Sequence, residues 1–195
     1  VYQGFDGQWT HKGVWRHGVD FVVADRETGL TYRNEGKSLE DYYCFDTAVV
    51  APVTGTVVEC VDDRGDNKPG CVDRENSWGN YIIIWSYYGY YIVISHLRKG
   101  SCLVKKGEGI GIGQVIGRCG NSGNSPQPHI HLQCQYSPLI GAQSVPFAFT
   151  NMVRNNATFH YGEYEVQAGD CVRSPGASRD IAAQANLQLD ETYRY

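Results

Sequence analysis

The segment of residues 79–97 holds two apolar runs on either side of a short stretch that contains a glycine. The runs at 81–84 and 91–96 are rich in β-branched and aromatic residues, which favour strands. The residues between the runs suit a tight turn. The segment therefore predicts an antiparallel hairpin, with His96 at the end of its second strand.

Two further segments favour short strands over helices. Residues 47–60 contain runs of valine and threonine that are interrupted by proline and glycine. In residues 104–117 glycine recurs so densely that a helix could not persist, and the pattern suits turns between short strands. The chain as a whole has 23 glycines and 14 tyrosines. We therefore predict an all-β fold built from antiparallel sheets, as a single sheet or a sandwich with a groove.

The length of 195 residues fits one domain with a sizeable core. We assign residues 1–173 to this domain. After a Pro-Gly-Ala-Ser break the pattern changes, and we expect residues 174–195 to form a short helical tail or a linker. The sequence has no apolar run long enough for a transmembrane segment. It begins at Val1 without a signal-like segment, so we expect that any export signal has been removed.

The formal net charge is −4, and no basic run is present. Binding to nucleic acid depends on clustered lysine and arginine side chains that neutralise phosphates. The charge pattern therefore argues against nucleic acid as a partner.

Seven cysteines occur without a Cys-x-x-Cys pair, so the spacing typical of structural zinc is absent. Disulfides in an oxidising compartment are the preferred interpretation. Cys60 and Cys71 flank a loop at 62–70, and we predict a bridge between them. The odd count leaves at least one thiol outside any internal disulfide. The alternative is that the cysteines are reduced and behave as small apolar residues.

His129 and His131 stand one residue apart in the stretch Pro-His-Ile-His-Leu at 128–132. Side chains alternate along a strand, so both imidazoles would lie on the same face. One can bind a metal while the other handles a proton of the metal-bound water. The alternative is an idle pair of imidazoles on a half-buried sheet.

An ordered set of motifs across roughly residues 11–135 resembles the core of the lysostaphin-type zinc metalloendopeptidases. The matching segments are residues 49–58, 79–84, 95–97, 104–107, 113–117, 120–125 and 128–132. The resemblance implies an antiparallel β fold with a groove that carries one Zn²⁺ per chain. It also implies a peptidoglycan peptide as substrate, cleavage within its stems or cross-bridges, and a secreted, periplasmic or cell-envelope location.

The resemblance also implies roles for individual residues. His131 and Asp20 match metal ligands of the family, and His129 matches its catalytic histidine, which would act as general base. His96 matches the other active-site histidine, which would stabilise the oxyanion as a hydrogen-bond donor.

The chain departs from the family at the first histidine ligand, where it has Arg16. A guanidinium is permanently cationic and has no lone pair for a metal. His11, which begins a His-x-Gly pattern, is our preferred replacement and requires an insertion before Asp20. His17 is the rival, and a bulge would have to turn it inward. The remaining alternative is that neither histidine binds and the site holds no metal.

These expectations lead to one main hypothesis and two alternatives. The main hypothesis is a zinc-dependent endopeptidase that cleaves peptidoglycan peptides through a zinc-activated water. The first alternative is a catalytically silent domain of the same fold that binds peptidoglycan or regulates another hydrolase, and Arg16 is its support. The second is a secreted zinc-bearing signalling or structural protein. Retention of four of the expected site residues favours the enzyme.

Overall fold

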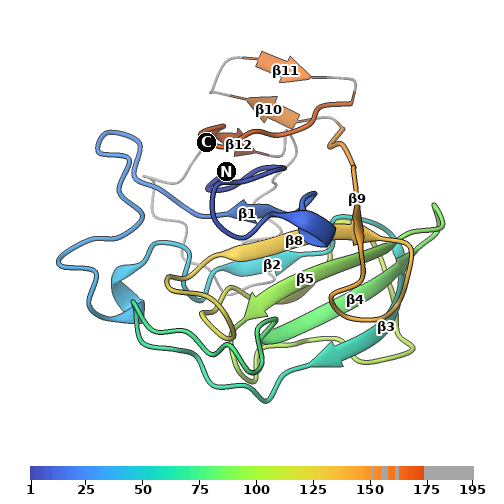
Figure 1. The fold of residues 1–195 in the computed structure, drawn as a ribbon. Helices are drawn as coiled ribbons and strands as arrows, with labels where there is room; N and C mark the ends of the chain where they lie inside the picture. The colour runs from blue at the N-terminus through green and yellow to red at the C-terminus, as the bar shows by residue number, and fades with distance from the viewer. Residues whose placement is uncertain (151, 155–157, 161–162, 174–195) are drawn as a thin grey trace.

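The computed structural model describes residues 1–150, 152–154, 158–160 and 163–173. The described residues form an antiparallel β structure with two single-turn 3₁₀ helices, η1 (Gly13–Trp15) and η2 (Leu39–Asp41) (Figure 1). The predicted fold class is therefore confirmed. The strands are β1 (Val19–Phe21), β2 (Ala48–Val50), β3 (Gly55–Val61), β4 (Asn80–Ser86), β5 (Tyr91–Leu97), β6 (Gly109–Ile110), β7 (Val115–Arg118), β8 (Ile130–Gln135), β9 (Ser144–Val145), β10 (Met152–Arg154), β11 (Thr158–His160) and β12 (Val172–Arg173).

The central sheet has seven strands in the order β1-β8-β5-β4-β3-β6, and β9 also pairs with β8. Each of these pairings is antiparallel. Strands β2 and β7 form a two-stranded sheet, and β11, β10 and β12 form a three-stranded one. Figure 1 shows the three-stranded sheet beyond β1, close to the N-terminus.

The predicted hairpin at 79–97 is confirmed as the pair β4 and β5. Its turn contains Gly89 with φ 86°, a left-handed conformation that glycine adopts without strain. His96 is the second-last residue of β5, as predicted. The segments at 47–60 and 104–117 also contain short strands separated by turns, namely β2 with β3 and β6 with β7.

The two faces of the central sheet pack against different residues, because side chains alternate along each strand. In β4, Ile82 and Ile84 face the main apolar cluster, whereas Tyr81 and Ile83 belong to a smaller cluster on the opposite face. The main cluster includes residues of the sheet formed by β2 and β7. The two-stranded sheet therefore covers one face of the central sheet.

The structure corrects the cysteine pairing that the sequence predicted. It contains no disulfide among the residues described, and the Cys60 thiol is hydrogen-bonded to Cys102 rather than placed beside Cys71. The loop that carries Cys71 is held elsewhere: Asn67 N–H donates to the Asn121 carbonyl, and Gly70 N–H donates to the Pro126 carbonyl. These contacts hold the loop against the segment after β7, and Cys71 is exposed.

Among the described residues, no helix has the length and apolar character needed to cross a membrane. The tail predicted at 174–195 lies outside the described residues.

The central sheet yields a stability prediction. Ile82 is fully buried at the middle of the main cluster, whereas Ile112 is 70% exposed in a turn. We expect Ile82→Ala to lower the free energy of unfolding by about 2–5 kcal/mol, because it leaves a cavity. Ile112→Ala is the matched control and should change it by less than about 0.5 kcal/mol. Urea denaturation measures both, and equal effects would contradict the assigned core.

Candidate active site and metal centre

Asp20 and His131 are neighbours across two paired strands. Asp20 is the middle residue of β1, and the antiparallel register places it directly opposite His131 of β8. Both residues are buried, with exposed fractions of 2% and 6%. The strand pairing therefore joins a carboxylate and an imidazole that are 111 residues apart in the sequence.

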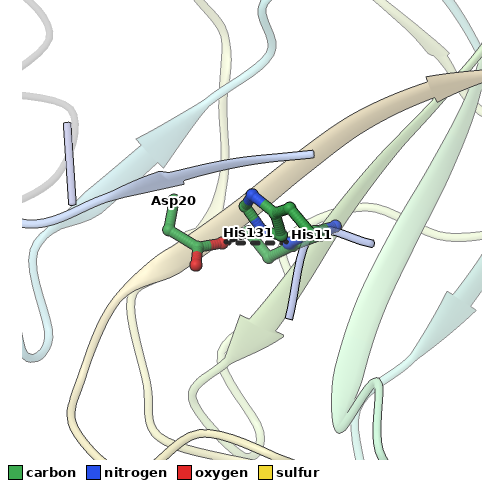
Figure 2. Close-up of side chains that lie close together, drawn as sticks. All are labelled: His11, Asp20 and His131. Carbon is green, nitrogen blue, oxygen red and sulfur yellow. Dashed lines mark hydrogen bonds and ion pairs between the residues drawn. The ribbon is translucent and has the colours of Figure 1, made fainter. Parts of the chain in front are cut away.

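His11 reaches the same point from the segment before η1, and it is almost completely buried. Its Nδ1–H donates to the Gly4 carbonyl at 2.9 Å, because a carbonyl oxygen can only accept. In the neutral ring the other nitrogen, Nε2, therefore carries a lone pair. Figure 2 shows His11 beside Asp20 and His131, and Nε2 is the ring nitrogen that contacts both.

Three potential ligand atoms from these residues lie close together (Figure 2). His11 Nε2 lies 3.1 Å from Asp20 Oδ1 and 3.2 Å from His131 Nδ1. His131 Nδ1 lies 2.9 Å from Asp20 Oδ1. Ligands at about 2.0–2.1 Å from a tetrahedral zinc ion are roughly 3.3 Å apart. The spacing and the donor set therefore fit a zinc ion held by two imidazoles and one carboxylate, with a fourth position open.

The electrostatics of the site favour a positive charge at this point. Burial by itself would raise the pKa of Asp20, but His129, His11 and His131 together hold it well below its usual range, so Asp20 is a carboxylate. Burial opposes protonation of His11, yet the contact with Asp20 outweighs it and raises the pKa of that imidazole. A proton or a metal cation can supply the charge that the carboxylate attracts.

Gln3 orients the Asp20 carboxylate. Its Nε2 donates to Asp20 Oδ2 at 2.7 Å, which leaves Oδ1 for the two histidines. The side-chain oxygen of Gln3 in turn accepts the backbone N–H groups of Trp9 and Thr10. The amide is thereby held in one orientation, immediately beside the segment that carries His11.

Gly18 allows the two imidazoles to approach each other. A Cβ atom at this position would lie 2.6 Å from His131 Cε1 and 3.0 Å from His11 Nε2. Real Cβ atoms do not approach other heavy atoms as closely as the first of these distances. A side chain larger than hydrogen would therefore displace at least one of the rings.

The structure places the two rival histidines differently. His11 joins Asp20 and His131, whereas His17 packs its ring on Phe5 at a centroid distance of 5.2 Å and contacts the Ser144 carbonyl through Nδ1 at 3.2 Å. Arg16 is exposed and pairs with Asp6 at 2.8 Å. The 3₁₀ turn η1 lies between His11 and Arg16.

His129 and His96 approach the three-residue cluster from the side. His129 Nδ1 lies 2.9 Å from the Gln127 carbonyl, and His96 Nδ1 lies 2.8 Å from the Ser122 carbonyl. Both Nδ1 atoms must carry the proton in these contacts, so in the neutral rings both Nε2 atoms are proton acceptors. His129 Nε2 lies 3.8 Å from Asp20 Oδ1, and the His96 and His129 ring centroids are 4.6 Å apart.

His96 has an unusual backbone conformation, with φ 66°. A non-glycine residue is rarely found in this left-handed region, and such strain persists only where surrounding contacts enforce it. His96 N–H donates to the Trp78 carbonyl, and the His96 carbonyl accepts from Gly120. The pairing of β4 with β5 shifts register here, since Tyr81 lies opposite Ser95 and Asn80 opposite Leu97, so His96 is the extra residue on β5.

Burial keeps the two flanking histidines uncharged. It holds the pKa of His96 well below its usual range, with help from the nearby His129 and His131. Burial also lowers the pKa of His129, although Asp20 opposes the effect. Both rings are therefore neutral near pH 7 and available to take up a proton.

These residues line a cavity of about 580 Å³ with aromatic walls. Trp78 packs edge-on against His131 at a centroid distance of 5.5 Å, and Trp15 packs against Trp78 at 5.8 Å. Tyr2 and Trp9 stack on each other at 5.1 Å and also border the cavity. The histidines and Asp20 are thus accessible to a ligand in a largely apolar environment.

Sequence reasoning missed several residues that shape the site, including Gln3, Gly18 and Trp78. Gly18 carries a local signal, since it stands two residues before Asp20 where a strand begins. Gln3 and Trp78 carry none, because their contacts are made with residues distant in the sequence.

The model of peptidase family M23 matches residues 40–143, which is just over half of the chain. The chain therefore belongs to peptidase family M23. His96, His129 and His131 lie within the matched residues, whereas His11 and Asp20 precede them.

Among individual proteins, the chain is 42% identical over 92 residues to the peptidoglycan DD-endopeptidase ShyA of Vibrio cholerae. The match covers 45% of this chain and 21% of that protein, so the chain spans about a fifth of the length of this curated relative.

Two solved structures of the family are also similar. The catalytic domain of the prophage-encoded M23 protein EnpA from Enterococcus faecalis has a TM-score of 0.47 at 17% identity, covering 75% of this chain and 85% of that chain. The catalytic domain of lysostaphin from Staphylococcus simulans has a TM-score of 0.44 at 23% identity, covering 73% and 84%.

The contact at Gly18 generates a prediction about metal affinity. We expect Gly18→Ala to weaken binding of Zn²⁺ roughly 10- to 100-fold, the range found for changes in the support of metal ligands. Gly65→Ala is the control, because a Cβ there meets nothing within 4 Å. Competition with a chromophoric chelator measures both affinities. Unchanged affinity in Gly18→Ala would show that the two imidazoles do not bind one ion together.

Proposed function

We propose that this chain is a zinc-dependent endopeptidase that hydrolyses peptide bonds of peptidoglycan. The observation that carries the proposal is the convergence of His11 Nε2, Asp20 Oδ1 and His131 Nδ1 beside an accessible cavity that two further histidines line. Membership in peptidase family M23 supports the reaction class.

His11, Asp20 and His131 would hold one Zn²⁺ per chain. A zinc ion held by three protein ligands lowers the pKa of a bound water to about 7 and polarises the carbonyl of a substrate. The protein contributes a carboxylate that is ionised, two imidazoles held by neighbours, and a cavity poor in charge.

His129 is our candidate for the general base. Its Nδ1 is anchored on the Gln127 carbonyl, so its Nε2 can accept a proton from a water that lies near Asp20 and His131. The same nitrogen could then deliver the proton to the leaving amine.

His96 is the candidate for stabilising the oxyanion, but its contacts require that its ring be protonated first. Because Nδ1–H is committed to the Ser122 carbonyl, His96 can donate from Nε2 only after that atom has gained a proton. The short distance between the His96 and His129 rings allows both to share the protonation changes of the reaction.

The substrate class comes from the similarity to a peptidoglycan DD-endopeptidase. The alternative of a silent binding or regulatory domain rests on Arg16, and the position of His11 beside Asp20 and His131 supports the enzyme over it. Binding of peptidoglycan without release of amino groups would favour that alternative.

A pair of histidine variants tests the assignment. We expect His131→Ala to lose zinc and to lose release of amino groups from purified peptidoglycan, because one of three ligands is gone. His17→Ala is the matched control and should keep both properties, since His17 packs on Phe5 outside the cluster. Elemental analysis and an amine-specific reagent provide the two readouts.

The chelation experiment on the unmodified chain completes this test. Chelator should abolish the release of amino groups and added Zn²⁺ should restore it. Full zinc content in His131→Ala, or loss of zinc in His17→Ala, would contradict the proposed ligand set.

We further propose that the chain works outside the cytoplasm, in a secreted, periplasmic or cell-envelope location. Two thiol pairs are in contact, Cys44 with Cys119 and Cys60 with Cys102. In an oxidising compartment, exchange with a low-molecular-weight disulfide would convert each pair to a protein disulfide and reduce the reagent to two thiols.

Peptide mapping after incubation with oxidised glutathione tests the two pairs. We expect cross-links between Cys44 and Cys119 and between Cys60 and Cys102. Cys134 provides an internal control, because burial raises the pKa of its thiol to about 11, whereas the contact with a neighbouring thiol lowers the pKa of Cys44 and of Cys60. A link between Cys60 and Cys71 would contradict the arrangement of the structure.

A further inference from the structure

Two buried glutamines follow His131 on β8 and share its face of the sheet. Gln133 and Gln135 alternate in step with His131, as side chains of a strand do. Both have an exposed fraction of 0%. A buried polar side chain is costly unless its hydrogen bonds are satisfied, so their contacts define a fixed arrangement.

The arrangement begins at two backbone carbonyls. Gln135 Nε2 donates to the carbonyls of Ser137 and Leu139, at 2.5 and 2.9 Å. Because carbonyl oxygens only accept, the NH₂ group of Gln135 must face them. Its side-chain oxygen therefore points the other way, toward Gln133.

The orientation of Gln135 determines the orientation of Gln133, which in turn determines which nitrogen of His131 is protonated. Gln133 Nε2 donates to Gln135 Oε1 at 2.8 Å, so Gln133 Oε1 faces His131 Nε2, at 3.2 Å. An amide oxygen only accepts, and His131 Nε2 must carry the proton. The remaining ring nitrogen, Nδ1, faces Asp20 Oδ1 at 2.9 Å and is the one on the side of the proposed metal site.

We propose that Gln133 and Gln135 are positioning residues that keep a proton on His131 Nε2 and thereby leave Nδ1 as the ring nitrogen that binds the metal. The proposal rests on the zinc site of the proposed function and adds to it a chain of hydrogen bonds that ends on the loop after β8. Partners of this kind commonly fix the orientation and basicity of metal-bound histidines.

Ser95 provides a matched control close to the same place. It lies directly opposite His131 in the register of β5 and β8, and it is fully buried. Its Oγ has no hydrogen-bond partner among the residues that the structure describes. Ser95→Ala therefore changes the surroundings of His131 without removing a link of the chain.

The first measurement uses the unmodified protein. Nitrogen-15 NMR of the metal-free chain at pH 8 distinguishes protonated from unprotonated ring nitrogens. We expect His131 Nε2 to carry a proton, because it faces the Gln133 side-chain oxygen. An Nε2 without a proton would overturn the proposal, whether or not any variant folds.

The second measurement compares variants by their affinity for Zn²⁺. Gln133→Met removes the acceptor for His131 Nε2–H, and we expect affinity to fall roughly 10- to 100-fold and the preference for the Nε2–H tautomer to be lost. Ser95→Ala should bind Zn²⁺ as tightly as the unmodified chain, because it removes no link of the chain of hydrogen bonds. Equal affinities of Gln133→Met and the unmodified chain, or an equal loss in Ser95→Ala, would overturn the proposal.

These results separate the failure of this proposal from that of the proposed function. If the unmodified chain binds no Zn²⁺, the proposed function fails, and the NMR result still decides the tautomer. If the chain binds Zn²⁺ and Gln133→Met binds it equally well, only the positioning role fails.

Discussion

The contact between Asp20 and His131 across β1 and β8 is the interaction on which the rest of the site depends. It places an ionised carboxylate in a buried position, where isolated charges are strongly unfavourable. The carboxylate is tolerated because Gln3 binds one oxygen and His11 and His131 surround the other. The contacts that stabilise the buried carboxylate also bring the imidazoles of His11 and His131 and the carboxylate of Asp20 together at one point.

The hydrogen bonds around the four histidines have a common effect, because each determines which nitrogen of its imidazole carries a proton. The Gly4, Gln127 and Ser122 carbonyls each determine the protonated nitrogen of one histidine, and Gln133 does so for His131. The consequence is that one defined nitrogen of each ring is directed at the site, Nδ1 of His131 and Nε2 of the other three. A metal or a transferable proton can use them without rearrangement of the side chains.

Sequence patterns predicted the parts of this structure that depend on local order. Alternation and turn residues predicted the β4–β5 hairpin and the position of His96, and the spacing of His129 and His131 placed both at the same strand end. The sequence alone left His11 and His17 as rivals, because the answer depends on how the 3₁₀ turn η1 takes up the extra residues.

Contacts between distant segments explain what sequence reasoning missed. The proximity of Cys60 to Cys102 depends on the folding of the intervening loops, and no spacing rule reveals it. Gln133 and Gln135 do alternate in phase with His131, but the orientation of their amides follows from the carbonyls of Ser137 and Leu139 in the next loop. The sequence therefore shows where each glutamine lies on the strand, but it does not show which groups accept or donate its hydrogen bonds.

X-ray absorption at the zinc edge of the zinc-loaded chain tests the central claim most directly. The structure predicts a first shell of nitrogen and oxygen atoms only, at about 2.0–2.1 Å, with the outer scattering of two imidazoles. The chain contains seven cysteines, so the competing ligands are thiolates. Sulfur at about 2.3 Å, or scattering from no imidazole, would contradict a metal centre built from His11, Asp20 and His131.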